Sequence, residues 1–216
     1  MFEKITPEHS AALDEIIGAR RSVRAFDSTS PGRKVVETII KAGLAAPFSA
    51  SAQAGKTDFR KIVVMSKESP AMNAAAGLIA KWAAEYAREL EKESGPSPFT
   101  RLLKEYGQQG LLFTTAPYYV VLAEEKSGAS SFVDMYIRHS LGYCLHNMWL
   151  KATTLRVGLQ VITSTMALDN DPDFCELLGI APGKYVLDGC ALGYPSDTYQ
   201  PPAVRYPDMA TSLRWL

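Results

Sequence analysis

The longest uninterrupted helical pattern in the chain runs from about Phe132 to Leu155 and contains no proline. Apolar side chains recur on more than one side of this predicted helix, at Met135, Leu141, Leu145, Met148, Trp149 and Ala152. A helix with so little polar surface must be covered by other elements. We therefore expect it to lie buried at the centre of the fold.

Shorter elements are predicted around this helix. Helices are expected where a polar capping residue precedes a proline, which suits the first helical turn, at Thr6-Pro7, Ser30-Pro31, Ser69-Pro70 and Asp171-Pro172. Runs rich in β-branched residues predict strands at Phe59–Met65, Tyr118–Ala123 and Lys184–Leu192. The connections are long and one helix exceeds what such a sheet needs, which favours an α+β fold over a regular doubly wound sheet.

The composition is that of an ordinary soluble globular protein, with 47% hydrophobic and 21% charged residues in a chain of 216. Lys+Arg and Asp+Glu both number 23, which argues against a nucleic-acid or anionic-membrane partner, because such partners require excess positive charge. No apolar run approaches the roughly 20 residues of a membrane span, and Met1–Lys4 lacks the apolar core of a signal peptide. We therefore expect a cytoplasmic protein without a membrane partner.

The cysteines and histidines give little sign of a metal or disulfide. The 3 cysteines, Cys144, Cys175 and Cys190, have no C-x-x-C spacing and are expected to be buried free thiols. His139 and His146 share a helix face, but no third ligand is visible. We expect no metal.

A basic cluster, Arg20–Arg24, directly follows the first predicted helix. Its three arginines carry planar forks of N–H donors that match phosphate oxygens, and Ser22 adds a hydroxyl. The cluster could therefore hold one phosphate and one electron-rich ring. It could also be a solvated basic helix end, where cations are ordinarily favourable.

The sequence does not support the other common binding or catalytic motifs. Gly55-Lys56-Thr57 imitates the end of a phosphate-binding P-loop, but Ala50 stands where the motif requires glycine, and a strand rather than a helix follows. No Gly-x-Gly-x-x-Gly follows a strand and no Gly-x-Ser-x-Gly elbow is present. Cys144 and His146 point in different directions on one helix, so they do not suggest a nucleophile and its base.

Four motifs in a fixed order carry a resemblance to a known family. They are Arg20–Phe26, then Ala46–Gln53, then Asn147 with Leu155–Leu159, and finally Gly193–Pro195 followed by Pro202–Pro207. Over nearly its full length the chain resembles the FMN-dependent nitroreductase family. The resemblance implies one domain, 1–216, with a small, mostly antiparallel sheet flanked by helices. It also implies an intertwined homodimer, in which a C-terminal tail, about 196–216, wraps the partner subunit.

The resemblance assigns cofactor-binding residues one by one. Arg20, Ser22 and Arg205 would hold the phosphate and ribityl end of FMN, and Arg21 would lie at the same polar edge. Arg24 would lie beside N1 and O2 of the flavin ring. The other subunit would contribute Pro47, Phe48, Ser49 and Ser51. A loop would lie against the ring and offer a backbone N–H near N5, with contacts from Val161, Ile162, Thr163 and Ser164.

The activity implied is ping-pong hydride transfer. NADH or NADPH would reduce the flavin at N5, and a small-molecule acceptor such as a nitroaromatic or quinone would then take the electrons. No protein side chain needs to act as acid or base, so no catalytic residue is predicted. The alternatives are a specialised relative that cleaves flavin or removes halogen, and a flavin-binding protein without turnover.

Several residues depart from the family pattern. Phe48, Ser51 and Ala54-Gly55 stand where the family usually has Ser, Asn and Pro-Trp or Pro-His. Thr163 and Thr165 occupy a loop that often carries Pro and Glu or Gly, and Ala203 replaces a lysine that some members use on the phosphate. We expect FMN binding to survive these changes, and substrate and partner contacts to differ.

Overall fold

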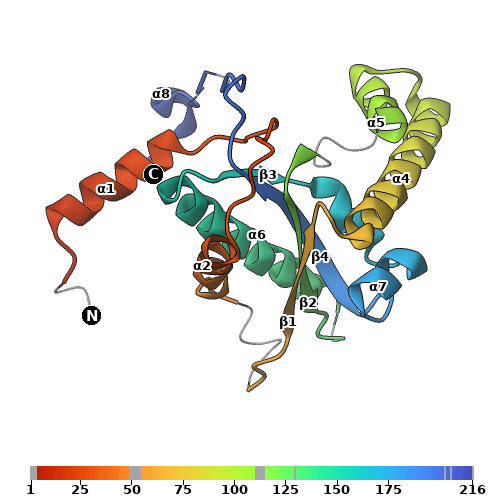
Figure 1. Ribbon diagram of the computed structural model, residues 1–216, viewed down its shortest axis with the longest axis horizontal. Helices are drawn as coiled ribbons and strands as arrows, with labels where there is room; N and C mark the ends of the chain where they lie inside the picture. Colours follow the sequence, from red (N-terminus) through yellow and green to blue (C-terminus); the bar gives the residue numbers. More distant parts are fainter. Residues whose placement is uncertain are drawn as a thin grey trace.

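The sheet of the protein has four antiparallel strands in the order β1-β2-β4-β3 (Figure 1). The computed structural model describes residues 4–48, 55–109, 115–128, 130–201, 203–204 and 206–215. The strands are β1 (Arg60–Ser66), β2 (Tyr118–Glu125), β3 (Gly158–Val161) and β4 (Tyr185–Gly193). Helices flank this sheet, which confirms the predicted α+β class.

The helices agree with the sequence in most places. They are α1 (Pro7–Ala19), α2 (Arg33–Leu44), α4 (Pro70–Ser94), α5 (Pro98–Gln109), α6 (Ser131–Thr154), α7 (Pro172–Leu178), α8 (Met209–Ser212) and the 3-10 helix η2 (Thr163–Leu168). The helix expected from Ser30-Pro31 begins slightly later, with Gly32 as its N-cap. Helix α4 ends at its C-cap Gly95, and α5 packs back on α4 around Leu103.

Each face of the sheet has its own core. Side chains of alternate strand residues point to opposite faces, so Val120 and Leu122 of β2 pack toward α2 and α6, whereas Tyr119 and Val121 pack toward α4 and α7. Figure 1 shows α6 lying along one face and α4 and α7 on the other. The three cysteines are buried free thiols, as predicted.

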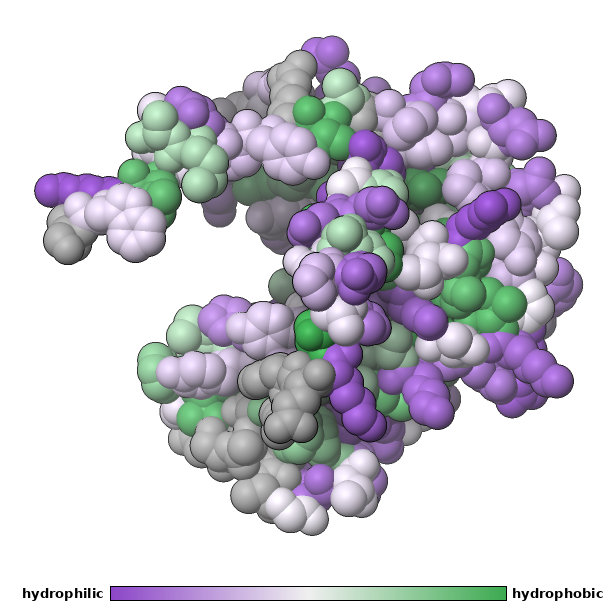
Figure 2. All heavy atoms as spheres, turned by 90° about the vertical axis from the view of Figure 1, so that its left-hand side faces the viewer, coloured by the Kyte–Doolittle hydropathy of each residue, from purple (hydrophilic) through white to green (hydrophobic). Residues whose placement is uncertain are grey.

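The outer face of α6 differs from the expectation of full burial. Four large apolar residues on it are exposed, namely Phe132, Met135, Tyr136 and Tyr143. Helix α1 is exposed too, for no residue of it is buried and Leu13 and Ile17 face solvent. Figure 1 shows α1 projecting away from the sheet, and the space-filling view of this side in Figure 2 shows a deep hollow in the surface. Some of the apolar side chains of α1 and α6 are thus left uncovered by the described residues of this chain.

The segment after α1 lies against the end of the sheet. Ser22 forms a parallel bridge with Leu159 of β3, and Phe26 forms an antiparallel bridge with Pro195. Two facing glycines allow this approach: a Cβ on Gly158 would lie 2.7 Å from Val23, and one on Gly193 would lie 2.9 Å from Phe26. Val23 and Phe26 therefore pack against β3 and β4 only because positions 158 and 193 carry no side chain. These contacts attach the basic cluster to the sheet.

In the part of the chain that the structure describes, no helix is long and apolar enough to cross a membrane. Within the same residues, no group of three or more His, Cys, Asp and Glu side chains is arranged to hold a metal ion.

Gly158→Ala should destabilise the protein by about 1–3 kcal/mol, because its methyl group forces buried Val23 out of place. Gly77→Ala is the matched control: it lies in α4 with nothing near its added Cβ, so it should stabilise by up to about 1 kcal/mol. Urea unfolding measures both changes. Equal effects at the two sites would show that the contact with Val23 is unimportant.

Candidate functional site

The basic cluster forms an extended segment along β3. The N–H of Val23 donates to the carbonyl oxygen of Leu159 at 3.2 Å, and the Val23 side chain is buried. Because side chains alternate along an extended chain, Ser22 and Arg24 lie on the other side from Val23. Ser22 is partly exposed and Arg24 is exposed, so both face outward from this edge of the sheet.

The remaining arginines are fixed by α1 and α6. Arg21 donates from Nη1 to the carbonyl oxygens of Gly18 at 2.5 Å and Arg20 at 2.8 Å, where α1 ends. The Arg20 guanidinium lies 4.3 Å from the centroid of the Trp149 ring. Trp149 in turn donates from Nε1 to the carbonyl oxygen of Arg21 at 3.0 Å. One tryptophan of α6 thus holds the backbone of the cluster and stacks under its first guanidinium.

The hydrogen-bond donors of the cluster that have no partner among the described residues suit an anion. Within the described residues, neither Arg20 nor Arg24 forms an ion pair, and the Ser22 hydroxyl makes no hydrogen bond. The Ser22 carbonyl oxygen, by contrast, accepts a hydrogen bond from the Tyr199 hydroxyl. Two uncompensated cations beside a free hydroxyl are the groups that bind phosphate. These residues therefore fit the phosphate end of the predicted cofactor.

Strand β3 brings residues 161–164 to the same edge. Val161 ends β3, and the N–H of Ile162 donates to the carbonyl oxygen of Gly189 at 2.8 Å. Thr163 is exposed and Ser164 partly buried at the start of η2. The pairing of Ser22 with Leu159 places this turn and the basic cluster on neighbouring backbone segments. Two of the predicted groups of site residues are thus held on adjacent backbone segments of one chain.

Gln160 is a candidate site residue that none of the sequence motifs includes. Its side chain is buried in β3, and no described residue pairs with its Oε1 atom. Such an acceptor costs free energy unless a partner satisfies it. A lone polar residue between Leu159 and Val161 was the available signal in the sequence.

The other predicted residues lie elsewhere or outside the described residues. Pro47 and Phe48 are exposed beyond α2, where the Phe48 ring lies 4.7 Å from that of Phe59. They border an open pocket of about 190 Å³, which Tyr136, His139, Ser140 and Tyr143 complete. No described contact joins them to Arg20–Arg24. Three further predicted residues fall outside the described part of the chain, namely Ser49, Ser51 and Arg205.

A buried ion pair lies beneath this pocket. Arg60 donates to Glu124 Oε2 from Nη2 at 2.6 Å and from Nε at 2.9 Å, and Nη2 also donates to Ser140 Oγ at 2.6 Å. The side chains of Arg60 and Glu124 are 4% and 0% exposed. Ser140 Oγ lies 3.5 Å from the carbonyl oxygen of Pro47. The network therefore connects β1, β2 and α6 to the segment that carries Phe48.

Burial also sets the protonation of groups on this side of the sheet. It raises the pKa of the Cys144 thiol to about 11 and that of the Asp188 carboxyl to about 6. Burial likewise raises the pKa of Cys190. Thiols held neutral in this way are poor nucleophiles, which agrees with their placement in the core.

The family model of the nitroreductase family matches residues 17–194. The chain belongs to this family. No curated protein matches the sequence.

Solved structures share the fold at low sequence identity. A BluB-like flavoprotein from Clostridium difficile 630 has a TM-score of 0.70 and 23% identity, with 94% of this chain and 98% of that chain covered. A nitroreductase with bound FMN from Desulfitobacterium hafniense DCB-2 has a TM-score of 0.66 and 21% identity, with 94% and 97% covered. An iodotyrosine deiodinase bound to FMN and 3-iodo-L-tyrosine has a TM-score of 0.65 and 17% identity, with 94% and 98% covered. These likenesses confirm the predicted nitroreductase-like fold.

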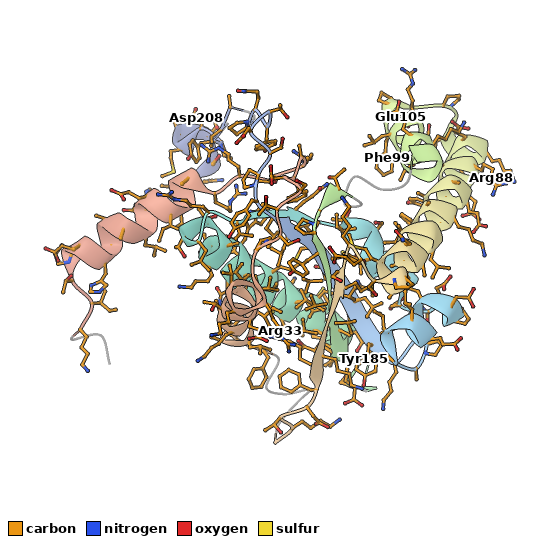
Figure 3. All side chains as sticks on the ribbon, in the orientation of Figure 1. Arg33, Arg88, Phe99, Glu105, Tyr185 and Asp208 are labelled. Carbon is orange, nitrogen blue, oxygen red and sulfur yellow. The ribbon has the colours of Figure 1, made fainter. Side chains whose placement is uncertain are left out.

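Arg60→Met should destabilise the protein by about 3–5 kcal/mol, because it leaves the fully buried Glu124 carboxylate without its cation. Arg33→Met is the control, since Arg33 is 91% exposed and projects from α2 (Figure 3), so losing its solvent-screened ion pair with Glu37 should change the free energy of unfolding far less. Urea unfolding of both variants decides the point. A loss at Arg60 no larger than at Arg33 would mean that the buried pair does not stabilise the fold.

Proposed function

We propose that the protein is an FMN-dependent oxidoreductase that takes hydride from NADH or NADPH and reduces a small-molecule acceptor such as a nitroaromatic or quinone. One observation carries the proposal: Ser22 and Arg24 face outward where the chain pairs with β3, Arg20 lies over Trp149, and neither arginine forms an ion pair with a described residue. Membership of the nitroreductase family and the likeness to an FMN-bound nitroreductase support it. The cytoplasmic location expected from the sequence belongs to the same proposal.

The residues of the chain would bind and orient the cofactor. When bound, FMN supplies the chemistry of accepting a hydride and passing on its electrons. Arg20 and Ser22, with Arg205, would hold the phosphate, and Arg21 would support them by fixing the backbone at the end of α1. Arg24 would place a fixed cation where negative charge accumulates on reduction, which stabilises the reduced flavin.

A second copy of the chain would complete the site. Pro47 and Phe48, with Ser49 and Ser51, would contact the cofactor held by the partner subunit, since within one chain no described contact joins them to the basic cluster. The exposed apolar side chains of α1 and of the outer face of α6 give such a homodimer a physical reason, because water otherwise contacts them. The tail would wrap the partner, and it exposes Tyr206, Met209, Leu213 and Trp215.

Reductive dehalogenation is a second candidate function. It rests on the shared fold of an iodotyrosine deiodinase bound to FMN and 3-iodo-L-tyrosine. Steady-state assays with 3-iodo-L-tyrosine and with a nitroaromatic, each supplied with the same reductant, separate the two candidates. Turnover of the iodinated amino acid alone would favour dehalogenation.

The proposal is tested by the absorption spectrum of the purified protein after incubation with FMN and gel filtration. We expect flavin bands that stay with the protein and bleach when NADH or NADPH is added without oxygen. Protein that emerges colourless would refute the cofactor site. Retained flavin that neither nucleotide reduces would point instead to a flavin-binding protein without turnover.

Arg24→Ala should lower the midpoint potential of bound FMN by about 30–60 mV, the equivalent for two electrons of one lost charge-assisted interaction. The affinity for FMN should fall by a smaller factor than the rate of flavin reduction, because Arg24 acts on the ring rather than on the phosphate. Arg24→Lys keeps the charge, so its midpoint potential should stay close to that of the wild type. The measurement is a redox titration with reference dyes, and an unchanged potential in Arg24→Ala would contradict the role of this residue.

A further inference from the structure

Thr165 lies wholly buried at the base of the turn that is assigned to the flavin ring. Its side chain is 0% exposed in η2. Its Oγ1 atom donates to the carbonyl oxygen of Ile162 at 2.6 Å and lies 2.7 Å from the hydroxyl oxygen of Tyr119 on β2. A hydrogen-bonded chain therefore runs from the sheet to the backbone of the turn.

The direction of this chain follows from proton counting. A threonine hydroxyl carries one hydrogen, and here the hydrogen points to the Ile162 carbonyl oxygen. Tyr119 must then be the donor to Thr165. Burial raises the pKa of the Tyr119 hydroxyl, so it keeps its proton across the physiological range.

A neighbouring strand holds the same turn from a second direction. The N–H of Ile162 donates to the carbonyl oxygen of Gly189 in β4 at 2.8 Å. A Cβ on Gly189 would lie only 2.6 Å from Thr165 Oγ1, so the hydroxyl occupies space that glycine leaves open. Both peptide groups of Ile162 are thus fixed, its N–H by β4 and its carbonyl by Thr165.

We propose that Tyr119 and Thr165 are positioning residues that hold the turn at 162–164 in the geometry its cofactor requires. This proposal rests on the proposed function, since it takes the turn to lie against FMN. Thr163 and Ser164 stay accessible above the turn, whereas Ile162 and Thr165 are buried beneath it. The pair also gives a physical reason for threonine at 165, since this hydroxyl accepts from Tyr119 and donates to the backbone at once.

Three variants test the pair. Thr165→Val removes the hydroxyl and keeps the shape, Thr165→Ser keeps the hydroxyl, and Tyr119→Phe removes the donor. Tyr118→Phe is the matched control, because its hydroxyl donates to the Pro31 carbonyl oxygen at 3.0 Å, away from the turn. Amide hydrogen exchange of the apo-protein reports on the turn, and FMN affinity and midpoint potential report on the cofactor.

We expect Thr165→Val and Tyr119→Phe to speed exchange at 162–166 about tenfold, as the loss of one buried hydrogen bond does, while exchange in α4 stays as in the wild type. FMN affinity should fall by a similar factor and the midpoint potential should shift. Thr165→Ser should restore all three values, and Tyr118→Phe should leave them unchanged.

Two results would overturn the proposal. Unchanged exchange at 162–166 in Thr165→Val would show that the pair does not hold the turn. Faster exchange with FMN affinity and potential equal to those of the wild type would show that the pair is structural only. Failure of the wild type to take up FMN is a separate result, which refutes the proposed function, whereas exchange in the apo-protein still decides whether the pair fixes the turn.

Discussion

The site depends on the close approach of Val23 to Gly158. This contact, together with the bridge between Ser22 and Leu159, attaches the basic stretch after α1 to the edge of the sheet. With Val23 buried, its neighbours Ser22 and Arg24 must face outward. A side chain at Gly158 would separate the cluster from β3 and hence from the turn at 162–164. Backbone packing, rather than the arginines themselves, therefore places the cluster where it is a candidate binding site.

Helix α6 holds both candidate segments, but at different places along its length. Trp149 binds the backbone of the basic cluster through the Arg21 carbonyl, whereas Ser140 contacts the Pro47 carbonyl. At 1.5 Å per residue, the backbone positions of these two residues are about 13.5 Å apart along the helix axis. One helix therefore fixes both segments and also keeps them separate. This separation is a physical argument for a site shared between two copies of the chain, and the exposed apolar side chains on the outer face of α6 favour the same arrangement.

The sequence revealed those features that local chemistry controls. Proline after a capping residue located α1, α4 and α7, and β-branched runs located β1, β2 and β4. The sequence does not predict strand β3, because this strand has only 4 residues and is defined by its pairing with β4. The network of Arg60, Glu124 and Ser140 joins residues distant in the chain, so no spacing pattern signals it. The hydrogen bonds of Arg21 to backbone carbonyl oxygens could not be predicted either, because every residue has a carbonyl group.

The most direct measurement compares the binding of FMN and riboflavin to the apo-protein by calorimetric titration. Riboflavin lacks the phosphate, so the comparison isolates the groups at Arg20–Arg24. FMN should bind at least about 100-fold more tightly, the equivalent of two charge-assisted hydrogen bonds, and Arg20→Ala should narrow the difference. Equal affinity for the two flavins, or binding of neither, would contradict the assignment of this edge of the sheet as the phosphate site.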